Sequence, residues 1–378
     1  MKVAVTTLAF CVAALLALGL VMLYSSTMTT SAGAHDLMMQ LVWCALGFVL
    51  CVTATSLDYQ LLKKLAWPAF GLALFLLALV FAPFIGHASH GAHRWIGHGR
   101  ITLQPSEFAK IALIITLAWH GDRNQRQMRT LKRGILIPMV IIGAMLGLIF
   151  VEPDRGQTIL LAAVTGAMLL IAGARWRYIL IPVFFGVAGL AFSLFHDSMR
   201  KGRISAWLHP EAHAGGAALQ AQQAMIGLGS GGWCGVGLGD GLEKNGYLPE
   251  IQTDFILANI GEELGLIATL FVVLAFVVIA ICGIYIAMRA RDTFGFLLAS
   301  GITFLISLQA AINIGVVTSA LPNKGLPLPF ISYGGSNLLA MLICVGLLFS
   351  VARHAPAREE ISKKASEADE NPFAARAA

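Results

Sequence analysis

The sequence is poor in charged residues. They make up 12% of its 378 residues, whereas hydrophobic residues make up 57%. Soluble globular domains carry about 25% charged residues, so this composition excludes an ordinary water-soluble fold. The mean hydropathy of +0.77 agrees and predicts a chain that folds in lipid.

Cysteines are also few, and their positions exclude a disulfide framework. Of the six cysteines, only Cys234 falls outside the apolar runs, and no pair has CxxC spacing. The net charge of +6 comes with no basic cluster interleaved with exposed aromatic residues, which single-strand binders need. We therefore expect no nucleic-acid partner.

Long apolar runs are abundant instead. A helix needs about 20 apolar residues to cross a bilayer. Ten runs are candidates: 3–24, 37–57, 65–85, 106–120, 134–151, 157–174, 178–196, 255–285, 293–318 and 334–352. The predicted fold class is all-α, a polytopic membrane protein of about ten transmembrane helices in one domain over residues 1–354. We interpret residues 355–378 as a polar, disordered cytoplasmic tail.

Basic residues gather in alternate connections between these runs. They are Lys63, Lys64, Arg123, Arg126, Arg129, Lys132, Arg133, Arg175, Arg177, Arg289, Arg291 and the tail from Arg353 onward. Cytoplasmic loops carry an excess of Lys and Arg, so we expect both termini in the cytoplasm.

Two segments on the opposite side are long enough for chemistry, namely 87–107 and the Gly-rich 197–254 between the seventh and eighth runs, and a third, shorter segment is 319–335. The last is too rich in Pro and Gly for regular helix. Non-helical backbone at membrane depth is tolerated only where it is buried in protein or lines a wet cavity. We therefore expect 319–335 to form the wall of a pocket.

Asp254 ends the second of these segments, and from Phe255 the chain is largely apolar as far as Ile286. An ionisable group at the bilayer edge costs free energy and marks a candidate functional site. Asp254 is therefore a candidate general base or metal-binding carboxylate. The alternative is an acid that caps the following helix, since Asp favours helix N-termini.

Other polar residues allow two interpretations. Glu262 and Glu263 lie two helical turns deeper, and at least one should meet a cation, for which Lys110 is a candidate. Arg203, with Arg200 and Lys201, forms either a pyrophosphate clamp or a contact with anionic lipid headgroups.

Two further patterns are weak. His87, His90, His93 and His98 have no nearby Cys or acid to complete a zinc site, which favours a wet, flexible loop. The Gly-x-Gly patterns of Gly227–Gly239 follow no strand, so a dinucleotide fingerprint is rejected.

Taken in order, the motifs of the chain resemble the SEDS family (shape, elongation, division and sporulation). The motifs are Arg94-Trp95, Gln104-Pro-Ser-Glu107-x-x-Lys110, Pro153-Asp154-x-Gly156, Arg203, Gln220-x-x-Gln223, Ile226-Gly-x-Gly-Ser-Gly-Gly232, Tyr247-Leu-Pro-Glu250, Thr253-Asp254-Phe255, Gly261-Glu-Glu-Leu-Gly265, Asn313-Ile-Gly315, Leu321-Pro-x-Lys-Gly325 and Pro329-Phe-Ile-Ser-Tyr-Gly-Gly-Ser336. Arg155, His209 and Gln252 depart from the usual family residues, but none of the departures touches Asp254. The sequence looks closer to the division branch, FtsW, than to the elongation branch, RodA.

The resemblance implies a multi-pass enzyme of the bacterial cytoplasmic membrane, a peptidoglycan glycosyltransferase that polymerises lipid II at the outer face. Asp254 matches the family's essential Asp. We assign substrate contacts to Arg203, Lys324, Arg94, Lys110, Glu107, Gln104, Trp95 and Ser332, and structural support to Glu250, Glu262, Glu263 and Asn313. The expected partners are a class B penicillin-binding protein and other division proteins. No organic cofactor is expected, while Mg²⁺ or Mn²⁺ at Asp254 is an open possibility.

Two rival functions fit part of the pattern. A lipid flippase or transporter would also have many spans, intramembrane acids and a broken segment. A non-catalytic scaffold for division enzymes is the third alternative. The polar residues concentrate on the outer side and not along a path through the midplane, which favours the enzyme.

Overall fold

The computed structural model describes residues 1–28, 33–82, 86–89, 92–98, 101–196, 198–209 and 219–355. Apart from Ala355, the predicted polar tail lies outside the described residues.

The ten apolar runs each coincide with a helix. The helices are α1 (Lys2–Thr27), α2 (Gly33–Ser56), α3 (Leu61–Leu79), α4 (Pro105–Arg123), α5 (Ile137–Val151), α6 (Arg155–Ile171), α7 (Trp176–His196), α10 (Ile256–Met288), α11 (Thr293–Val317) and α12 (Gly335–Arg353). Within the described chain, seven helices are long and apolar enough to cross a membrane, and α6 and part of α7 are shorter apolar helices. Helix α4 is less apolar because it carries Glu107, Lys110 and Asp122.

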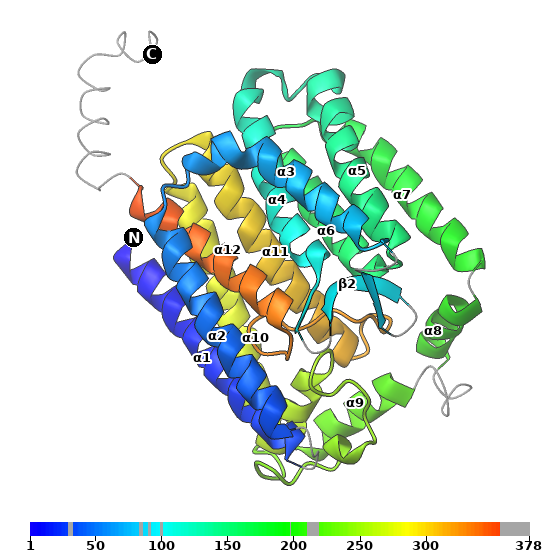
Figure 1. The fold of residues 1–378 in the computed structure, drawn as a ribbon. Helices are drawn as coiled ribbons and strands as arrows, with labels where there is room; N and C mark the ends of the chain where they lie inside the picture. The colour runs from blue at the N-terminus through cyan, green and yellow to red at the C-terminus, as the bar shows by residue number, and fades with distance from the viewer. Residues whose placement is uncertain are drawn as a thin grey trace.

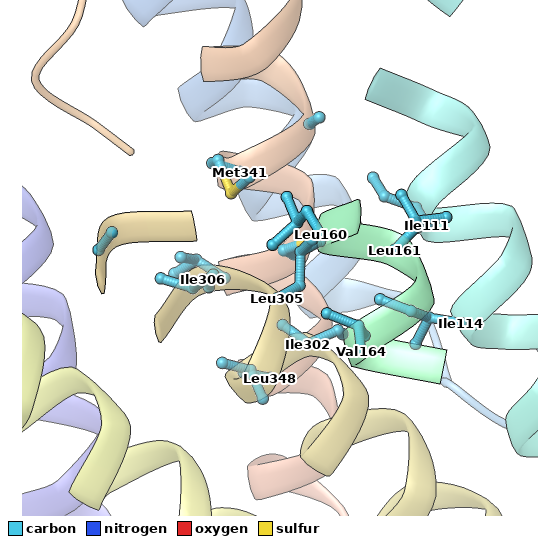
Figure 2. Packing of buried hydrophobic residues seen from close by; sticks show 14 of the residues in the cluster. Ile111, Ile114, Leu160, Leu161, Val164, Ile302, Leu305, Ile306, Met341 and Leu348 are labelled. Carbon is cyan, nitrogen blue, oxygen red and sulfur yellow. The ribbon is translucent and has the colours of Figure 1, made fainter. Parts of the chain in front are cut away.

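The core lies where α4, α6, α11 and α12 meet (Figure 2). Ile302, Leu305 and Ile306 of α11 face Leu160 and Val164 of α6 there, with Ile114 of α4 and Met341 of α12 closing the group. Helices α1, α2, α5 and α7 instead present exposed apolar side chains such as Phe10, Phe48, Val140 and Phe184. This distribution fits a bundle whose outer surface faces lipid.

The two ends of the bundle differ. The start of α1 and the end of α12 lie at one end, while β2, α8 (Ser198–Leu208) and α9 (Leu219–Ser230) lie away from it (Figure 1). The basic connections, such as the one between α4 and α5, belong to the first end, which we call the basic end. We call the other end the polar-loop end.

Residues 86–103 correct one expectation from the sequence. We expected a flexible loop, but β1 (Gly86–Ser89), β2 (Ala92–His98) and β3 (Ile101–Leu103) form an antiparallel sheet in the order β1-β2-β3. His90 lies outside the described residues. The sheet packs against the start of α4 and so gives the polar-loop end a folded wall.

The segment between α11 and α12 contains no helix, as its Pro and Gly content predicts. Phe330 and Gly334 adopt φ angles of 68° and 154°, which a continuing helix could not contain. We call residues 319–334 the broken segment.

Helix α10 differs from the one continuous span expected for residues 255–285, because it breaks at Gly265 (φ 79°, ψ −174°). The Gly-rich loop after α9 inserts at this break. Val236 and Gly237 donate their N–H groups to the carbonyls of Glu262 and Glu263, and Leu266 donates to Gly232. A Cβ at Gly265 would lie 2.4 Å from the nitrogen of Gly235, so the close approach requires glycine. The loop thereby satisfies the backbone groups that the break exposes.

Candidate active site

Asp254 lies in a tight turn at the polar-loop end, immediately before α10. The carbonyl of Glu250, a residue with φ of 59°, accepts hydrogen bonds from the N–H groups of Thr253, Asp254 and Phe255. The N-cap of α10 is Phe255, and no side chain caps the helix. The N-cap position is therefore occupied by Phe255 and not by Asp254, whose carboxylate is half-buried.

Asn313 ties this turn to the broken segment. Its Nδ2 donates to the carbonyl of Asp254 at 2.8 Å and to the carbonyl of Leu326 at 2.7 Å. Asn313 is almost fully buried on α11. One side chain thus fixes the backbone of Asp254 relative to Leu326, two residues after Lys324.

Ser332 makes a second link between the same two segments. Its hydroxyl donates to the carbonyl of Thr253 and accepts from the N–H of Leu328. Tyr333 N–H donates to the carbonyl of Gln252 at 2.9 Å. Because Ser332 is only 2% exposed, it holds the turn in place here, and the substrate contact assigned to it would require the segment to open.

The carboxylate of Asp254 lies against Gly325. A Cβ at position 325 would be 2.7 Å from Asp254 Oδ2, so a side chain there would displace the acid. The neighbouring Lys324 is half-buried, and this burial lowers the pKa of its ammonium group. The structure therefore brings the sequence-predicted Asp254 and Lys324 into one region, with an acid and a cation on facing segments.

Arg94 and Asp154 lie on the other side of the broken segment. Arg94 on β2 donates to the carbonyls of Glu152 and Pro153, at 3.1 and 2.8 Å, and so clamps the turn between α5 and α6. Asp154 caps α6 by accepting from Gln157 N–H at 3.1 Å. A Cβ at Gly156, in the first turn of α6, would lie 3.5 Å from the carbonyl of Gly325, so this clamped turn supports the residue beside Asp254.

Two carboxyl groups at this turn have raised pKa values. Burial, with the nearby charge of Asp154, raises the pKa of Glu152 to about 8, although Arg94 opposes the shift. Burial also raises the pKa of Asp154, against the opposing charge of Arg94. Gln104 donates from Nε2 to Asp154 at 3.2 Å and from its backbone N–H to Ser336 at 2.9 Å. Gln104 therefore joins the turn to α12.

Glu107 and Lys110 form an ion pair inside the bundle. Lys110 Nζ lies 2.7 Å from Glu107 and 3.1 Å from Gln309 Oε1, and neither charged side chain is more than 1% exposed. Gln157 donates to Glu107 at 2.5 Å. From these positions the pair connects α4 to α6 and α11, and the substrate contact assigned to it would require the bundle to open.

Glu262 and Glu263 do not pair with Lys110, which corrects the partner that the sequence suggested. Lys244, from the loop before the Asp254 turn, lies 2.9 Å from Glu263, and Ser25 of α1 donates to the same carboxylate. Glu262 accepts from the N–H of Leu242 at 2.7 Å. Contacts within the protein therefore hold both carboxylates.

Arg203 and Trp95 are the remaining sequence-predicted residues, and only the first has a side chain outside the described part of the structure. Arg203 lies on α8, but its side chain lies outside the described part of the structure. Trp95 is on β2 beside Arg94 and is half-buried. The pyrophosphate clamp at Arg203 therefore stays a prediction.

Three hydrogen bonds between elements around the site were not expected from the sequence. Asn323 of the broken segment donates to Gln220 of α9 at 2.6 Å, and Trp207 of α8 donates to the carbonyl of Ser319 at 2.9 Å. Gln157 joins α6 to Glu107. Gln220 belongs to a quoted motif, which could have drawn attention to it, whereas Trp207 carried no local signal.

A protein-built metal cage is not found among the described side chains, because no three His, Cys, Asp or Glu residues there gather as a metal-binding group. Mg²⁺ is commonly held by one or two carboxylates together with substrate phosphates. Asp254 can supply one such carboxylate, so the residues fit a metal that arrives with a phosphate-bearing substrate.

Known proteins resemble this chain over most of its length. The family described as cell cycle proteins of the FtsW, RodA and SpoVE type matches residues 6–357. The chain belongs to this family. It is 42% identical over 346 residues to a probable peptidoglycan glycosyltransferase FtsW of Trichlorobacter lovleyi, covering 90% of this chain and 91% of that protein. It is 35% identical over 345 residues to the stage V sporulation protein E of Bacillus subtilis, covering 90% of this chain and 94% of the relative.

Solved structures share the fold. A chain of a peptidoglycan synthase complex that coordinates polymerization and crosslinking matches with a TM-score of 0.75 and 25% identity, covering 92% of this chain and 96% of that chain. The rod shape determining protein RodA of Thermus thermophilus matches with a TM-score of 0.70 and 26% identity, covering 93% and 97%. The polytopic helical fold predicted from the sequence is confirmed.

Proposed function

We propose that this chain is a peptidoglycan glycosyltransferase that polymerises lipid II, with Asp254 as its central catalytic group. The observation that carries the proposal is the position of Asp254. Asn313 holds its backbone and Ser332 holds that of the preceding Thr253, while its carboxylate is half-buried against Gly325 and beside the segment that bears Lys324. The FtsW relatives, 42% and 40% identical to this chain, bear the same activity in their names.

The chemistry required is the attack of a sugar hydroxyl on an anomeric carbon whose leaving group is a lipid pyrophosphate. A positioned carboxylate that removes the hydroxyl proton accelerates such a step by roughly 100- to 10,000-fold. Asp254 takes this role, and the reaction inverts the anomeric centre because it is a single displacement.

Lys324 stabilises the leaving group. The pyrophosphate gains negative charge as the bond breaks, and a cation in a site of low water content stabilises that charge more than it would in water. The half-buried position of Lys324 suits this task. Arg203 is the second candidate cation. A Mg²⁺ or Mn²⁺ ion held by Asp254 and the substrate phosphates would supply further charge stabilisation.

The finer assignments follow the family. We propose that the chain acts in cell division, since relatives named FtsW match it at 42% and 40% identity. Its partner is a class B penicillin-binding protein, supported by the fold shared with a polymerising and crosslinking synthase complex. Other division proteins complete the assembly. The chain lies in the bacterial cytoplasmic membrane with both termini in the cytoplasm, supported by the common end of α1 and α12 and its basic connections.

Reconstitution with lipid II tests the function. Purified Asp254→Asn protein should lose at least about 100-fold in glycan polymerisation, because the amide cannot accept the proton. The matched control is Asp240→Asn, which removes an exposed acid from the same end of the bundle. Both variants should purify with unchanged melting temperature.

The same assay separates the rival functions. Transfer of lipid II across the vesicle membrane without polymer formation would identify a flippase. The absence of both transfer and polymer would identify a scaffold. Polymerisation by the Asp254→Asn protein at the native rate would remove Asp254 from the mechanism. Repeating the native reaction with chelator and with added Mg²⁺ or Mn²⁺ tests the metal separately.

A further inference from the structure

A cavity of about 340 Å³ lies at the basic end, far along α4 from the candidate active site. It is formed by α3, the end of α4 and the start of α5, and its lining includes Trp67, Trp119, Arg123 and Arg133. The function proposed above makes no use of it. Its size falls in the range of about 300–1,000 Å³ that is typical of small-molecule sites.

The polar side of the cavity is built by a hydrogen-bonded set. His120 Nε2 donates to the carbonyl of Arg133 at 2.8 Å, which places a proton on Nε2. Asn124 donates to the carbonyl of His120 at 3.0 Å and accepts from Arg133 Nη1 at 3.0 Å. His120 is buried, so these contacts hold Arg133 at the cavity by a fixed framework.

The aromatic side of the cavity holds the second cation. The rings of Trp67 and Trp119 meet edge to face with centroids 5.7 Å apart, and the guanidinium of Arg123 lies 5.3 Å from the centroid of Trp119. Such a cation–π contact orients a guanidinium without neutralising its charge. Both cations of the cavity are therefore positioned and still carry full positive charge.

Acidic residues do not balance this charge. No Asp or Glu occurs in the sequence from Arg123 to Val151. Asp122 is already paired with Lys63 at 3.1 Å. Within the part of the chain that the structure describes, no ion pair joins Arg123 or Arg133 to a carboxylate. Two guanidinium groups with free donor edges match the oxygens of a phosphate.

The mouth of the cavity continues into lipid-facing surface. Trp67 is 48% exposed, and Leu131, Leu136 and Val140, from the α4–α5 connection and α5, are also exposed. Trp residues favour the membrane–water interface, and basic pockets between membrane helices on the cytoplasmic side receive anionic lipid headgroups. The backbone is also unusual here, since Lys132–Leu136 forms a π-helical turn, a feature that often marks functional sites.

We propose that this cavity binds a phosphate group, and that the phosphate belongs to an anionic phospholipid. Arg123 and Arg133 contact the phosphate, Trp67 and Trp119 pack on the glycerol and upper acyl carbons, and the chains leave the cavity over α3 and α5. The site would anchor the α4–α5 connection at the membrane surface.

The alternative is that the basic residues bind no specific lipid and act only through their total charge, which sets the orientation of the chain in the membrane. Arg126 and Arg129 offer a matched control, because they belong to the same connection but do not line the cavity. Delipidated full-length protein in non-ionic detergent would be titrated with phosphatidylglycerol, with phosphatidylcholine and with inorganic phosphate. Bound lipid would be counted by native mass spectrometry, and melting temperature measured in parallel.

Phosphatidylglycerol should bind and raise the melting temperature, whereas phosphatidylcholine and inorganic phosphate should not. The R123Q/R133Q variant should weaken phosphatidylglycerol binding at least about tenfold, since hydrogen bonds to charged groups are lost. The R126Q/R129Q variant should keep native affinity. Equal weakening in both variants would overturn the cavity site, and equal stabilisation by inorganic phosphate would overturn the lipid as its source.

A charge-conserving variant tests whether misfolding explains a loss of lipid binding. R123K/R133K retains both charges and is expected to fold and insert like the native chain. It should still weaken phosphatidylglycerol binding, because an ammonium group cannot make the two-pronged contact of a guanidinium. Native affinity in this variant would also contradict the proposal.

Discussion

The carboxylates on helix α10 and just before it lie in two contrasting settings. Glu262 and Glu263 are 2% and 1% exposed, and their oxygens accept from backbone N–H groups, Ser25 and Lys244. Asp254, just before the same helix, is half-buried and beside Gly325. In the first setting the side-chain charge is satisfied within the protein. In the second, Asn313 and the Glu250 carbonyl hold the backbone, and the carboxylate is only half-buried.

This contrast separates structural from catalytic acids in a membrane protein. A buried charge persists only when it is paired and hydrogen-bonded, which describes Glu263. A catalytic group needs a fixed position and also access to its reactant, and this is the role that we propose for Asp254. Glu263 and Asp254 are both acids in an apolar chain, so the low content of charged residues could not show which of them is structural.

Breaking the structural pair should have the largest effect on stability. Lys244→Met leaves Glu263 buried without its cation, and removal of one partner of a buried pair costs about 3–5 kcal/mol. We expect a large fall in melting temperature in detergent. The double variant Lys244→Met with Glu263→Met should recover much of this loss, because it removes both charges. A double variant as unstable as the single one would mean that the ion pair is not the cause.

Filling the space beside Asp254 should affect activity more than stability. Gly325→Ala introduces a Cβ 2.7 Å from Asp254 Oδ2, so the carboxylate must move. A displacement of about 1 Å can reduce turnover by up to about 100-fold. Polymerisation of lipid II should fall while the melting temperature changes little.

Gly229→Ala is the matched control for this substitution, because a Cβ there meets nothing within 4 Å. It should polymerise at the native rate. Native activity in Gly325→Ala would show that the position of the Asp254 carboxylate is not critical.

Much of this arrangement could be predicted from the sequence, since ten apolar runs predict ten helices and a broken segment between the last two. The location of Asp254 at the entrance of a span also followed directly. The partner of Glu263 did not, because Lys244 comes from a Gly-rich loop whose path depends on the break at Gly265. That break is created by tertiary hydrogen bonds, which hydrophobic periodicity does not report.

The small sheet at residues 86–103 was missed for a similar reason. Its strands are short and rich in His and Gly, residues that do not favour strands by themselves. Arg94 on β2 reaches the carbonyls of Glu152 and Pro153, a contact made only after folding. Tertiary structure therefore decides these elements, whereas the spans follow from local composition.

The smallest expected effect concerns Glu152, a third acid that fits neither setting. Its pKa is raised from 4.5 to about 8, by burial first and by the charge of Asp154 second. The folded protein therefore binds a proton that the unfolded chain releases as the pH rises from 4.5 to about 8. Stability from this group is present in full below pH 4.5 and is lost as the pH rises through that window.

Melting temperature against pH would measure this loss. The native protein should lose stability between pH 5 and pH 8 more steeply than Glu152→Gln, which cannot ionise, while Asp240→Asn should follow the native curve. Titrating groups distant from Glu152 contribute equally to each protein, so the difference between the curves reports Glu152 together with its charge coupling to Asp154. Parallel curves for the native protein and Glu152→Gln would show that Glu152 is ionised throughout, and that Arg94 neutralises it through space.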